Sequence, residues 1–194
     1  MKRVAILLAL GLATLTGLAA GDGLSQGRSC TRDDSLDWRT LLKQRISAFG
    51  HRNWIVVADA AYPVHSSPGI ETVVTGADQL TVLKAVLDEL GHSTHVRPRV
   101  ILDAELSYVP EKDAPGVEKY RADLRDLLED RPRPQSVDHE EILSLLDSSA
   151  SAFKVLILKT SLTIPYTSVF LQLDCGYWSR EADDRMRAAM PKKQ

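Results

Sequence analysis

The stretch Gly50-His51-Arg52-Asn53-Trp54-Ile55-Val56-Val57-Ala58-Asp59-Ala60 decides the fold. Residues 54–58 form an apolar run rich in β-branched side chains, which is typical of a strand buried on both faces of a sheet. His51 and Asp59 flank this run, and a polar residue at a strand's carboxyl end faces the crevice where α/β proteins bind ligands. Taken alone, the stretch favours a simpler interpretation, with Asp59 capping a turn and His51 lying on the surface.

Outward from this stretch, short apolar runs alternate with segments whose apolar residues recur at helical spacing. Further strands are predicted over 70–74, 99–102, 153–158 and 168–173, and helices over 35–49, 78–90, 116–129 and from 138 onward. Alternating strands and helices predict an α/β fold with a mainly parallel sheet flanked by helices. We place this single domain at residues 35–178, between a flexible linker at 21–34 and a charged C-terminal tail at 179–194.

The first twenty residues have the pattern of a secretory signal peptide. Lys2 and Arg3 precede an apolar run from Val4 to Leu18, and small residues suited to cleavage follow it. An uncleaved membrane anchor is the alternative, but the run is short and diluted by glycine and threonine. We therefore expect an exported, periplasmic protein with a signal peptide at residues 1–20 and no stable membrane insertion after its cleavage.

The composition argues against nucleic acid as a partner. The chain has 194 residues, 44% of them hydrophobic, which suffices for one domain with a real core. Its 24 basic and 26 acidic side chains become 22 and 26 when the signal peptide is removed. A mildly acidic domain with dispersed charge has no electrostatic reason to bind nucleic acid or an anionic membrane.

The two cysteines, Cys30 and Cys175, could form a disulfide in an exported protein. Two unpaired thiols, or pairing between molecules, are the alternatives. His92 and His95 stand three residues apart, but no carboxylate or third histidine lies at ligand spacing. We interpret them as loop residues and expect no metal.

Another histidine, His139, lies in the first turn of a predicted helix that Asp138 caps. The positive end of the helix dipole disfavours a cationic imidazole, so a neutral ring is expected there. A neutral imidazole can accept a proton or a hydrogen bond, which suits an acid–base or binding role. A surface histidine without a role is an equally good interpretation of this position alone.

Three segments together resemble the RbsD/FucU family, which comprises D-ribose pyranase and L-fucose mutarotase. They are Gly50-His51 with Asp59-Ala60, then Asp138-His139-Glu140, then Ile157-Leu158-Lys159 with Pro165-Tyr166-Thr167-Ser168. Their joint order and spacing carry the resemblance, which extends over residues 41–173.

The resemblance implies a site. His51 matches the family's catalytic histidine, and Asp59, His139, Tyr166 and Ser168 match its sugar-binding positions. Lys159 stands where the family has arginine, which keeps the charge but loses the bidentate fork. Ser168 replaces a usual asparagine and Leu162 a usual glutamate. The family further implies no metal or organic cofactor, and a ring-shaped homo-oligomer, often a decamer, whose site a neighbouring subunit completes.

The expected activity follows from sugar chemistry. Opening a sugar ring requires removal of a proton from the anomeric hydroxyl and delivery of one to the ring oxygen, which suits histidine. We expect a monosaccharide mutarotase or pyranase in which His51 carries the proton and Asp59 orients it or binds hydroxyls. The alternative is a non-catalytic monosaccharide-binding or sensing module. A structural oligomer of the envelope with a vestigial site is a third hypothesis.

Overall fold

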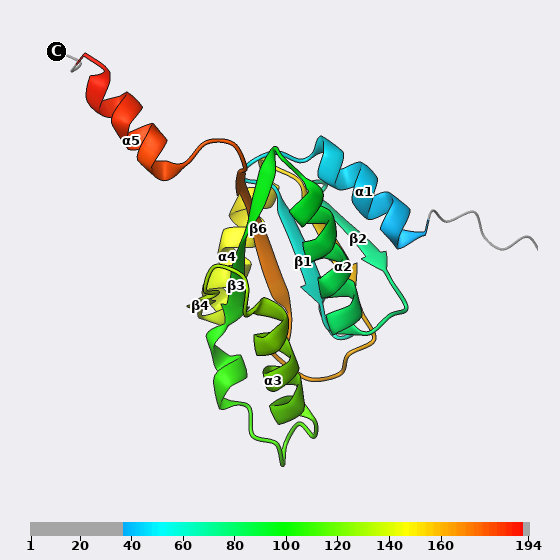
Figure 1. Ribbon diagram of the computed structural model, residues 1–194. Coiled ribbons are helices and arrows are strands. Elements are labelled where there is room, and N and C mark those ends of the chain that lie inside the picture. The colour runs from blue at the N-terminus through cyan, green and yellow to red at the C-terminus, as the bar shows by residue number, and fades with distance from the viewer. Residues whose placement is uncertain (1–36, 192–194) are drawn as a thin grey trace, which may run out of the picture. The chain divides into compact units, whose positions relative to one another are not determined.

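A six-stranded sheet forms the centre of residues 37–191, the part of the chain that the computed structural model describes. The strands lie in the order β2-β5-β1-β6-β3-β4 (Figure 1). Their bounds are Trp54–Ala58 for β1, Ile70–Val74 for β2, Val96–Asp103 for β3, Gln135–Val137 for β4, Val155–Lys159 for β5 and Val169–Cys175 for β6.

The sheet is parallel except for β6. Strand β1 pairs in parallel with β5, β5 with β2, and β3 with β4, whereas β6 runs antiparallel to both β1 and β3. The predicted α/β fold with a mainly parallel sheet is confirmed. The reversal of β6 follows from its short connection to β5 over residues 160–168, since a parallel return requires a crossover of a dozen residues or more.

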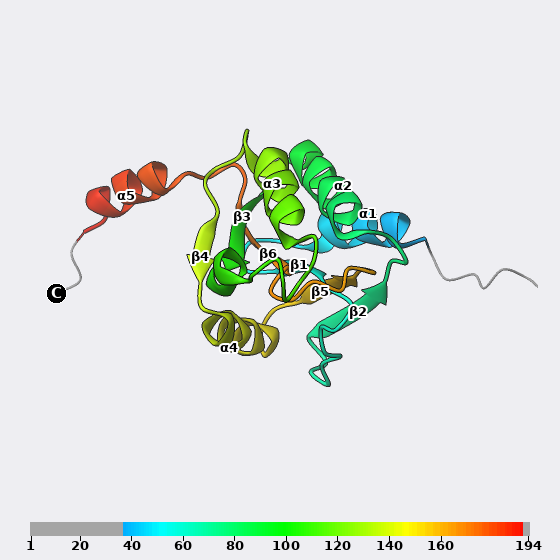
Figure 2. The ribbon, with the colours of Figure 1, turned by 90° about the horizontal axis from the view of Figure 1, so that it is seen from below.

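Helices cover both faces of the sheet, as Figure 2 shows. Helices α1 (Trp38–Ala48), α2 (Gln79–His92) and α3 (Val117–Leu128) pack on one face, and α4 (His139–Ala150) on the other. Strand β1 is buried on both faces because its residues alternate between the two cores, Ile55 and Val57 facing one, and Trp54, Val56 and Ala58 the other. This is the two-sided burial expected for a continuous apolar run.

Some elements differ from those predicted. Strand β4 was not predicted, because it has three residues, two of them polar, and is too short to show an apolar period. Strand β3 begins at Val96, before the predicted start, although Pro98 supplies no N–H to the ladder. Helix α2 runs through Gly91 to His92 and ends at the extended Ser93, so that glycine does not terminate it. A short 3₁₀ helix, η1 (Ala104–Tyr108), directly follows β3.

The proposed signal peptide, the 21–34 linker and Cys30 lie outside the described residues. Cys175 is the last residue of β6. Helix α5 (Arg180–Ala189) lies in the predicted charged tail and buries none of its residues. Across residues 37–191, no helix combines the length and apolar character needed to cross a bilayer.

Candidate functional site

The candidate site lies at one edge of the sheet, where the parallel strands β1, β3 and β5 end. Strand β6 begins at the same edge because it runs in the opposite direction, with Val169 opposite Val57 of β1 and Leu102 of β3. The 160–168 connection therefore crosses this edge. Segments distant in sequence meet here because strand polarity brings them together.

A cavity of about 440 Å³ opens at this edge. Asp59, His139 and Tyr166, three of the residues predicted to form the sugar site, lie in its wall. The full lining is Asp59, Ala61, Tyr62, Pro63, His139, Glu140, Leu143, Pro165 and Tyr166. A neighbouring hollow of about 350 Å³ shares Asp59 and Pro165 with it, so that Asp59 stands between the two.

Both carboxylate oxygens of Asp59 are held by hydrogen bonds. The backbone N–H of Ala61 donates to Oδ1 at 2.9 Å, and the Ser168 hydroxyl donates to Oδ2 at 2.9 Å. Asp59 thus closes a turn, as the simpler interpretation of the sequence held, and it also faces the cavity. Its orientation is set by β1 and by the start of β6 together.

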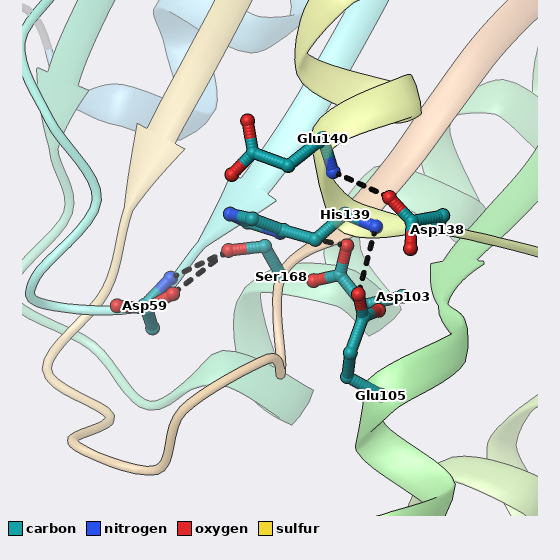
Figure 3. Close-up of polar contacts among 7 residues, drawn as sticks. All are labelled: Asp59, Asp103, Glu105, Asp138, His139, Glu140 and Ser168. Atoms are coloured by element: carbon teal, nitrogen blue, oxygen red, sulfur yellow. Dashed lines mark hydrogen bonds and ion pairs between the residues drawn. The ribbon is translucent and has the colours of Figure 1, made fainter.

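His139 pairs with Asp103, an aspartate that ends β3. The Nδ1 atom of His139 lies 3.0 Å from Oδ1 of Asp103, whose side chain is fully buried (Figure 3). The backbone N–H of His139 donates to Oε1 of Glu105 at 3.1 Å. The Tyr166 ring meets the imidazole edge-on, with ring centroids 5.4 Å apart and planes at 89°. The histidine is therefore contacted at its backbone, at one ring nitrogen and by one aromatic ring.

Burial dominates the electrostatics of this pair. Desolvation raises the pKa of Asp103, and the hydrogen bond and positive charge of His139 oppose that rise. Desolvation also raises the pKa of Tyr62, with the charges of Asp147, Asp103 and Asp59 acting in the same direction. Within residues 37–191, the Tyr62 hydroxyl, Oδ2 of Asp103 and Oε2 of Glu105 are buried without a hydrogen-bond partner. A buried polar atom without a partner is costly, so the Tyr62 hydroxyl, the one of the three in the cavity wall, favours a polar occupant there.

Asp103 and Glu105 were not predicted from the sequence. A signal was present, because Asp103-Ala104 stands at the end of β3 just as Asp59-Ala60 directly follows β1. Two strands with the same terminal pair at the same edge indicate two carboxylates in one region. The neighbourhood of Asp103 and His139 depends on tertiary structure, since 36 residues separate them.

A buried polar network holds the connection that carries Tyr166. The amide nitrogen of Gln79 donates to the carbonyls of Val57 and Thr167, and the Thr160 hydroxyl donates to the Gln79 amide oxygen at 2.7 Å. The Tyr120 hydroxyl donates to the Thr167 carbonyl at 2.8 Å. Tyr166 itself has a φ of 58°, in the left-handed region that few non-glycine residues adopt. The network keeps this strained residue beside the cavity.

His51 lies at the other end of β1. The turn before β1 contains it, and the next residue, Arg52, donates its N–H to the Leu173 carbonyl near the end of β6. The five residues of β1 span on the order of 16 Å, so His51 and Asp59 do not meet within one chain. The expectation that Asp59 orients His51 is therefore wrong within a chain, because the strand between them is fully extended. The catalytic role of His51 stays a prediction.

The two remaining predicted residues, Lys159 and Ser168, lie at the same edge of the sheet as the cavity. Lys159 ends β5 opposite Ala58, half-buried, and it is not part of the cavity wall. Ser168 is buried, with 2% of its surface exposed, and its hydroxyl is occupied by Asp59. The Ser168 hydroxyl therefore orients Asp59. The predicted contacts of Ser168 and of Lys159 with a sugar stay predictions.

No group of three or more metal-ligating side chains is present among residues 37–191. His95 instead binds the backbone, with Nε2 at 3.1 Å from the carbonyls of both Ile46 and Phe49. It thus closes the end of α1, whereas His92 is exposed at the end of α2.

Comparison with known proteins gives one family and several solved structures. RbsD from Bacillus subtilis in complex with D-ribose is 21% identical, with 69% of this chain and 90% of that chain covered and a TM-score of 0.48. The fucose mutarotase from Streptococcus pneumoniae in complex with L-fucose is 19% identical, with coverages of 69% and 89% and a TM-score of 0.46. FucU from Bifidobacterium longum is 18% identical, with coverages of 68% and 90% and a TM-score of 0.45.

No protein of curated function matches the sequence. The model of the RbsD / FucU transport protein family matches residues 39–175, which include every strand of the sheet and the whole candidate site. This match covers most of the chain and confirms the resemblance seen in the sequence. The chain belongs to the RbsD/FucU family.

Proposed function

We propose that this protein binds a monosaccharide and interconverts its anomers or ring forms by acid–base catalysis. The observation that carries the proposal is the convergence of Asp59, His139 and Tyr166 on one cavity in a member of this family. The cavity volume of about 440 Å³ lies within the usual range of small-molecule sites.

The chemistry of the wall suits a sugar. The Asp59 carboxylate accepts hydrogen bonds, as sugar hydroxyls require, and its two oxygens are already oriented. The Tyr166 side chain, 39% exposed, offers an apolar ring face together with a hydroxyl. His139 adds a ring nitrogen that can accept or donate. Lys159 lies outside the wall, at the end of the nearby strand β5, and its ammonium group is a candidate donor of hydrogen bonds to sugar hydroxyls.

The proton carrier His51 is supplied in this proposal by a second subunit. Asp59 and His51 of one chain are at opposite ends of β1, so a site that uses both must combine two chains. We therefore propose a homo-oligomer, of the ring type that the family resemblance implies, in which His51 of one subunit approaches the cavity of its neighbour. An exposed His51 at a turn is suited to such a contact.

Exchange NMR on D-ribose, L-fucose and related sugars tests the activity. We expect wild-type protein to accelerate exchange between anomers or ring forms, and His51→Ala and Asp59→Asn each to abolish most of that acceleration. His92→Ala, at an exposed helix end, is the matched histidine control and should keep wild-type rates. A fully active His51→Ala protein would contradict the role of His51.

Mixing two inactive variants tests the shared site. The test uses oligomers assembled from His51→Ala and Asp59→Asn subunits. If each site combines two chains, some sites receive wild-type His51 from an Asp59→Asn subunit and wild-type Asp59 from a His51→Ala subunit. We expect the mixture to regain part of the activity after co-refolding, and neither variant alone to do so. Activity that stays absent after demonstrated subunit exchange would contradict a site shared in this way.

A second candidate function is a non-catalytic monosaccharide-binding or sensing module. The observation in its favour is that the Ser168 hydroxyl is buried and occupied by Asp59, while Leu162 stands where the family has a glutamate. Saturation-transfer NMR separates the two functions. Sugar binding without faster exchange would favour the module.

We further propose that the chain is exported and that its signal peptide is cleaved near Ala20 or Gly21. The basic residues Lys2 and Arg3, the apolar run after them and the small residues at its end support this. Mass spectrometry of the protein from periplasmic extracts should find the new N-terminus, and thiol alkylation of the same sample tests the Cys30–Cys175 disulfide. Protein with an intact Met1 in the cytoplasm would contradict export.

A further inference from the structure

We propose that His139 is itself a proton-transferring residue of this site and that Asp103 is its positioning residue, holding the ring so that Nε2 serves as a base toward the sugar's anomeric hydroxyl. This inference rests on the proposed function and deepens it. It assigns to His139 a chemical role rather than only the binding of a hydroxyl.

The geometry of the pair carries the inference. Nδ1 of His139 is 3.0 Å from Oδ1 of Asp103. A neutral imidazole that donates Nδ1–H to a carboxylate keeps its lone pair on Nε2. The histidine lies in the cavity wall, and no side chain or carbonyl among residues 37–191 hydrogen-bonds to its Nε2. Figure 3 shows the imidazole extending from the start of α4 toward the side on which Asp59 and Ser168 lie.

Asp103 has no other evident role. It occupies the position before η1, yet its side chain makes no capping hydrogen bond there. Its side chain is fully buried, and within the described residues its hydrogen-bond partner is the His139 ring. Burying a carboxylate is unfavourable unless it is paired, so a carboxylate whose pairing is with a cavity histidine indicates a function for that histidine.

The backbone of His139 is also fixed. Its N–H donates to Glu105, and the preceding Asp138 accepts from the N–H of Glu140, which anchors the first turn of α4. With the backbone N–H and Nδ1 held by hydrogen bonds, the direction of Nε2 is determined before any ligand binds. A base oriented in advance loses no freedom in the reaction, which is how positioned groups contribute to rate.

The groups that surround the His139 ring are mostly acceptors. Asp103 and Glu105 approach from β3 and η1, Asp138 and Glu140 flank it on α4, and Asp59 and the Tyr166 phenol face it from the ends of β1 and of the 160–168 connection. The buried Tyr62 hydroxyl lies in the same wall. Positive charge that develops on the ring during proton transfer is thus met by carboxylates, Asp103 first among them.

The step balances as follows. Nε2 of His139 takes the proton of the anomeric hydroxyl, the bond between the anomeric carbon and the ring oxygen breaks, and the anomeric C–O bond becomes a carbonyl. The ring oxygen receives a proton from a second acid, which under the proposed function is His51 of a neighbouring subunit. Rotation of the carbonyl and the reverse transfers close the ring and return both protons.

Asp103→Asn tests the positioning role. Asparagine has the same size and can present either its oxygen or its N–H₂ to Nδ1, so the ring loses its fixed tautomer. We expect ¹⁵N NMR to find wild-type His139 protonated at Nδ1 and the variant as a mixture of tautomers. We expect kcat to fall by about 10- to 1,000-fold, which is part of the roughly 100- to 10,000-fold that acid–base groups contribute, with KM nearly unchanged. The variant should fold, since burial disfavours the charge that it removes.

Asp88→Asn is the matched control. It makes the same change to an exposed carboxylate of α2, which pairs with Lys84 and lines neither hollow of the site. It should preserve the His139 tautomer and kcat.

Three results would overturn the inference. An unchanged Nδ1–H tautomer, or a wild-type kcat, in Asp103→Asn would show that Asp103 does not position the ring, while the mutarotase function would stand. A wild-type protein that accelerates no sugar's exchange would remove the proposed function itself, and the proton transfer at His139 with it.

Discussion

The Ser168 hydroxyl donates a hydrogen bond to Oδ2 of Asp59 at 2.9 Å, joining residues 109 positions apart in the sequence. The Ser168 Oγ also accepts a hydrogen bond from the Asp59 N–H at 3.3 Å. One buried hydroxyl therefore binds both the backbone and the side chain of the aspartate. Ser168 thus has a defined partner although it is not in the cavity wall. It orients Asp59 rather than reaching into the cavity.

Loss of this hydroxyl should therefore weaken sugar binding indirectly. We expect Ser168→Ala to lower the free energy of unfolding by about 1.5–3 kcal/mol, the usual value for a hydrogen bond to a charged group. Sugar affinity should fall several-fold, as measured by NMR titration, because the Asp59 carboxylate is no longer fixed. Ser161→Ala, which removes an exposed hydroxyl from the same connection, is the control and should change neither quantity. Unaltered affinity in Ser168→Ala would contradict this role.

Gln79 should be essential to the stability of the connection that carries Tyr166. Its side chain is 1% exposed and hydrogen-bonds to Val57, Thr160 and Thr167. Gln79→Leu leaves these buried groups without partners, at about 1–3 kcal/mol for each group left unsatisfied. Urea denaturation should show a clear loss of stability in Gln79→Leu, whereas Gln44→Leu on the exposed face of α1 should be nearly neutral. Equal midpoints for the two variants would contradict the importance of the network.

His95 and His92 should differ sharply despite their proximity. His95 binds the carbonyls of Ile46 and Phe49 at the end of α1, where the Ile46 carbonyl also accepts the N–H of Phe49 at 3.3 Å. His95→Ala should lower the free energy of unfolding by about 1–2 kcal/mol, typical of a lost cap. His92→Ala should change it by less than about 0.5 kcal/mol, as an exposed substitution does. Thermal and urea unfolding of both variants measure the difference, and equal losses would refute the capping role.

The ion pair between Glu71 and Arg45 should make a pH-dependent contribution to stability. The hydrogen bond from Arg45, with N–O distances of 2.7 and 2.9 Å, lowers the pKa of Glu71 in the folded protein. Its stabilising effect is thus present above the unfolded pKa, near 4.5, and is lost as the pH falls through the lower folded value. Both side chains are more than a third exposed, so we expect the pair to contribute about 0.5 kcal/mol at neutral pH.

Glu71→Gln tests this dependence. The variant should be slightly less stable than wild type at pH 7, and the difference should vanish as the pH falls below the folded pKa of Glu71. Glu89→Gln, whose carboxylate is 3.9 Å from Lys43, should show a smaller change at pH 7. A difference between Glu71→Gln and wild type that is independent of pH would contradict the linkage.

The sequence predicted the parts of the fold that depend on local pattern. The apolar run of residues 54–58 predicted a strand buried on both faces, and β1 is such a strand. Asp78 and Asp138 predicted helix starts, and each side chain accepts a hydrogen bond from the first turn that follows. These features are local because side-chain periodicity and capping involve residues only a few positions apart.

Part of the site was likewise predictable. The family resemblance predicts one site for Asp59, His139 and Tyr166, and these residues meet at one cavity. The position after a parallel strand, or at the start of the helix that follows, places a residue at the ligand-binding edge of a sheet. The family model matches residues 39–175, which contain all three of these residues.

Only the tertiary structure decided the rest. The partner of His139 is Asp103, because β4 pairs in parallel with β3, which sets Val137 opposite Asp103, and α4 starts two residues after Val137. His51 lies apart from Asp59, because an extended strand places its two flanking residues at opposite edges of the sheet. The direction of β6 brings Ser168 to Asp59. Sequence order determines which strand ends carry polar residues, but strand polarity and register determine which of them touch.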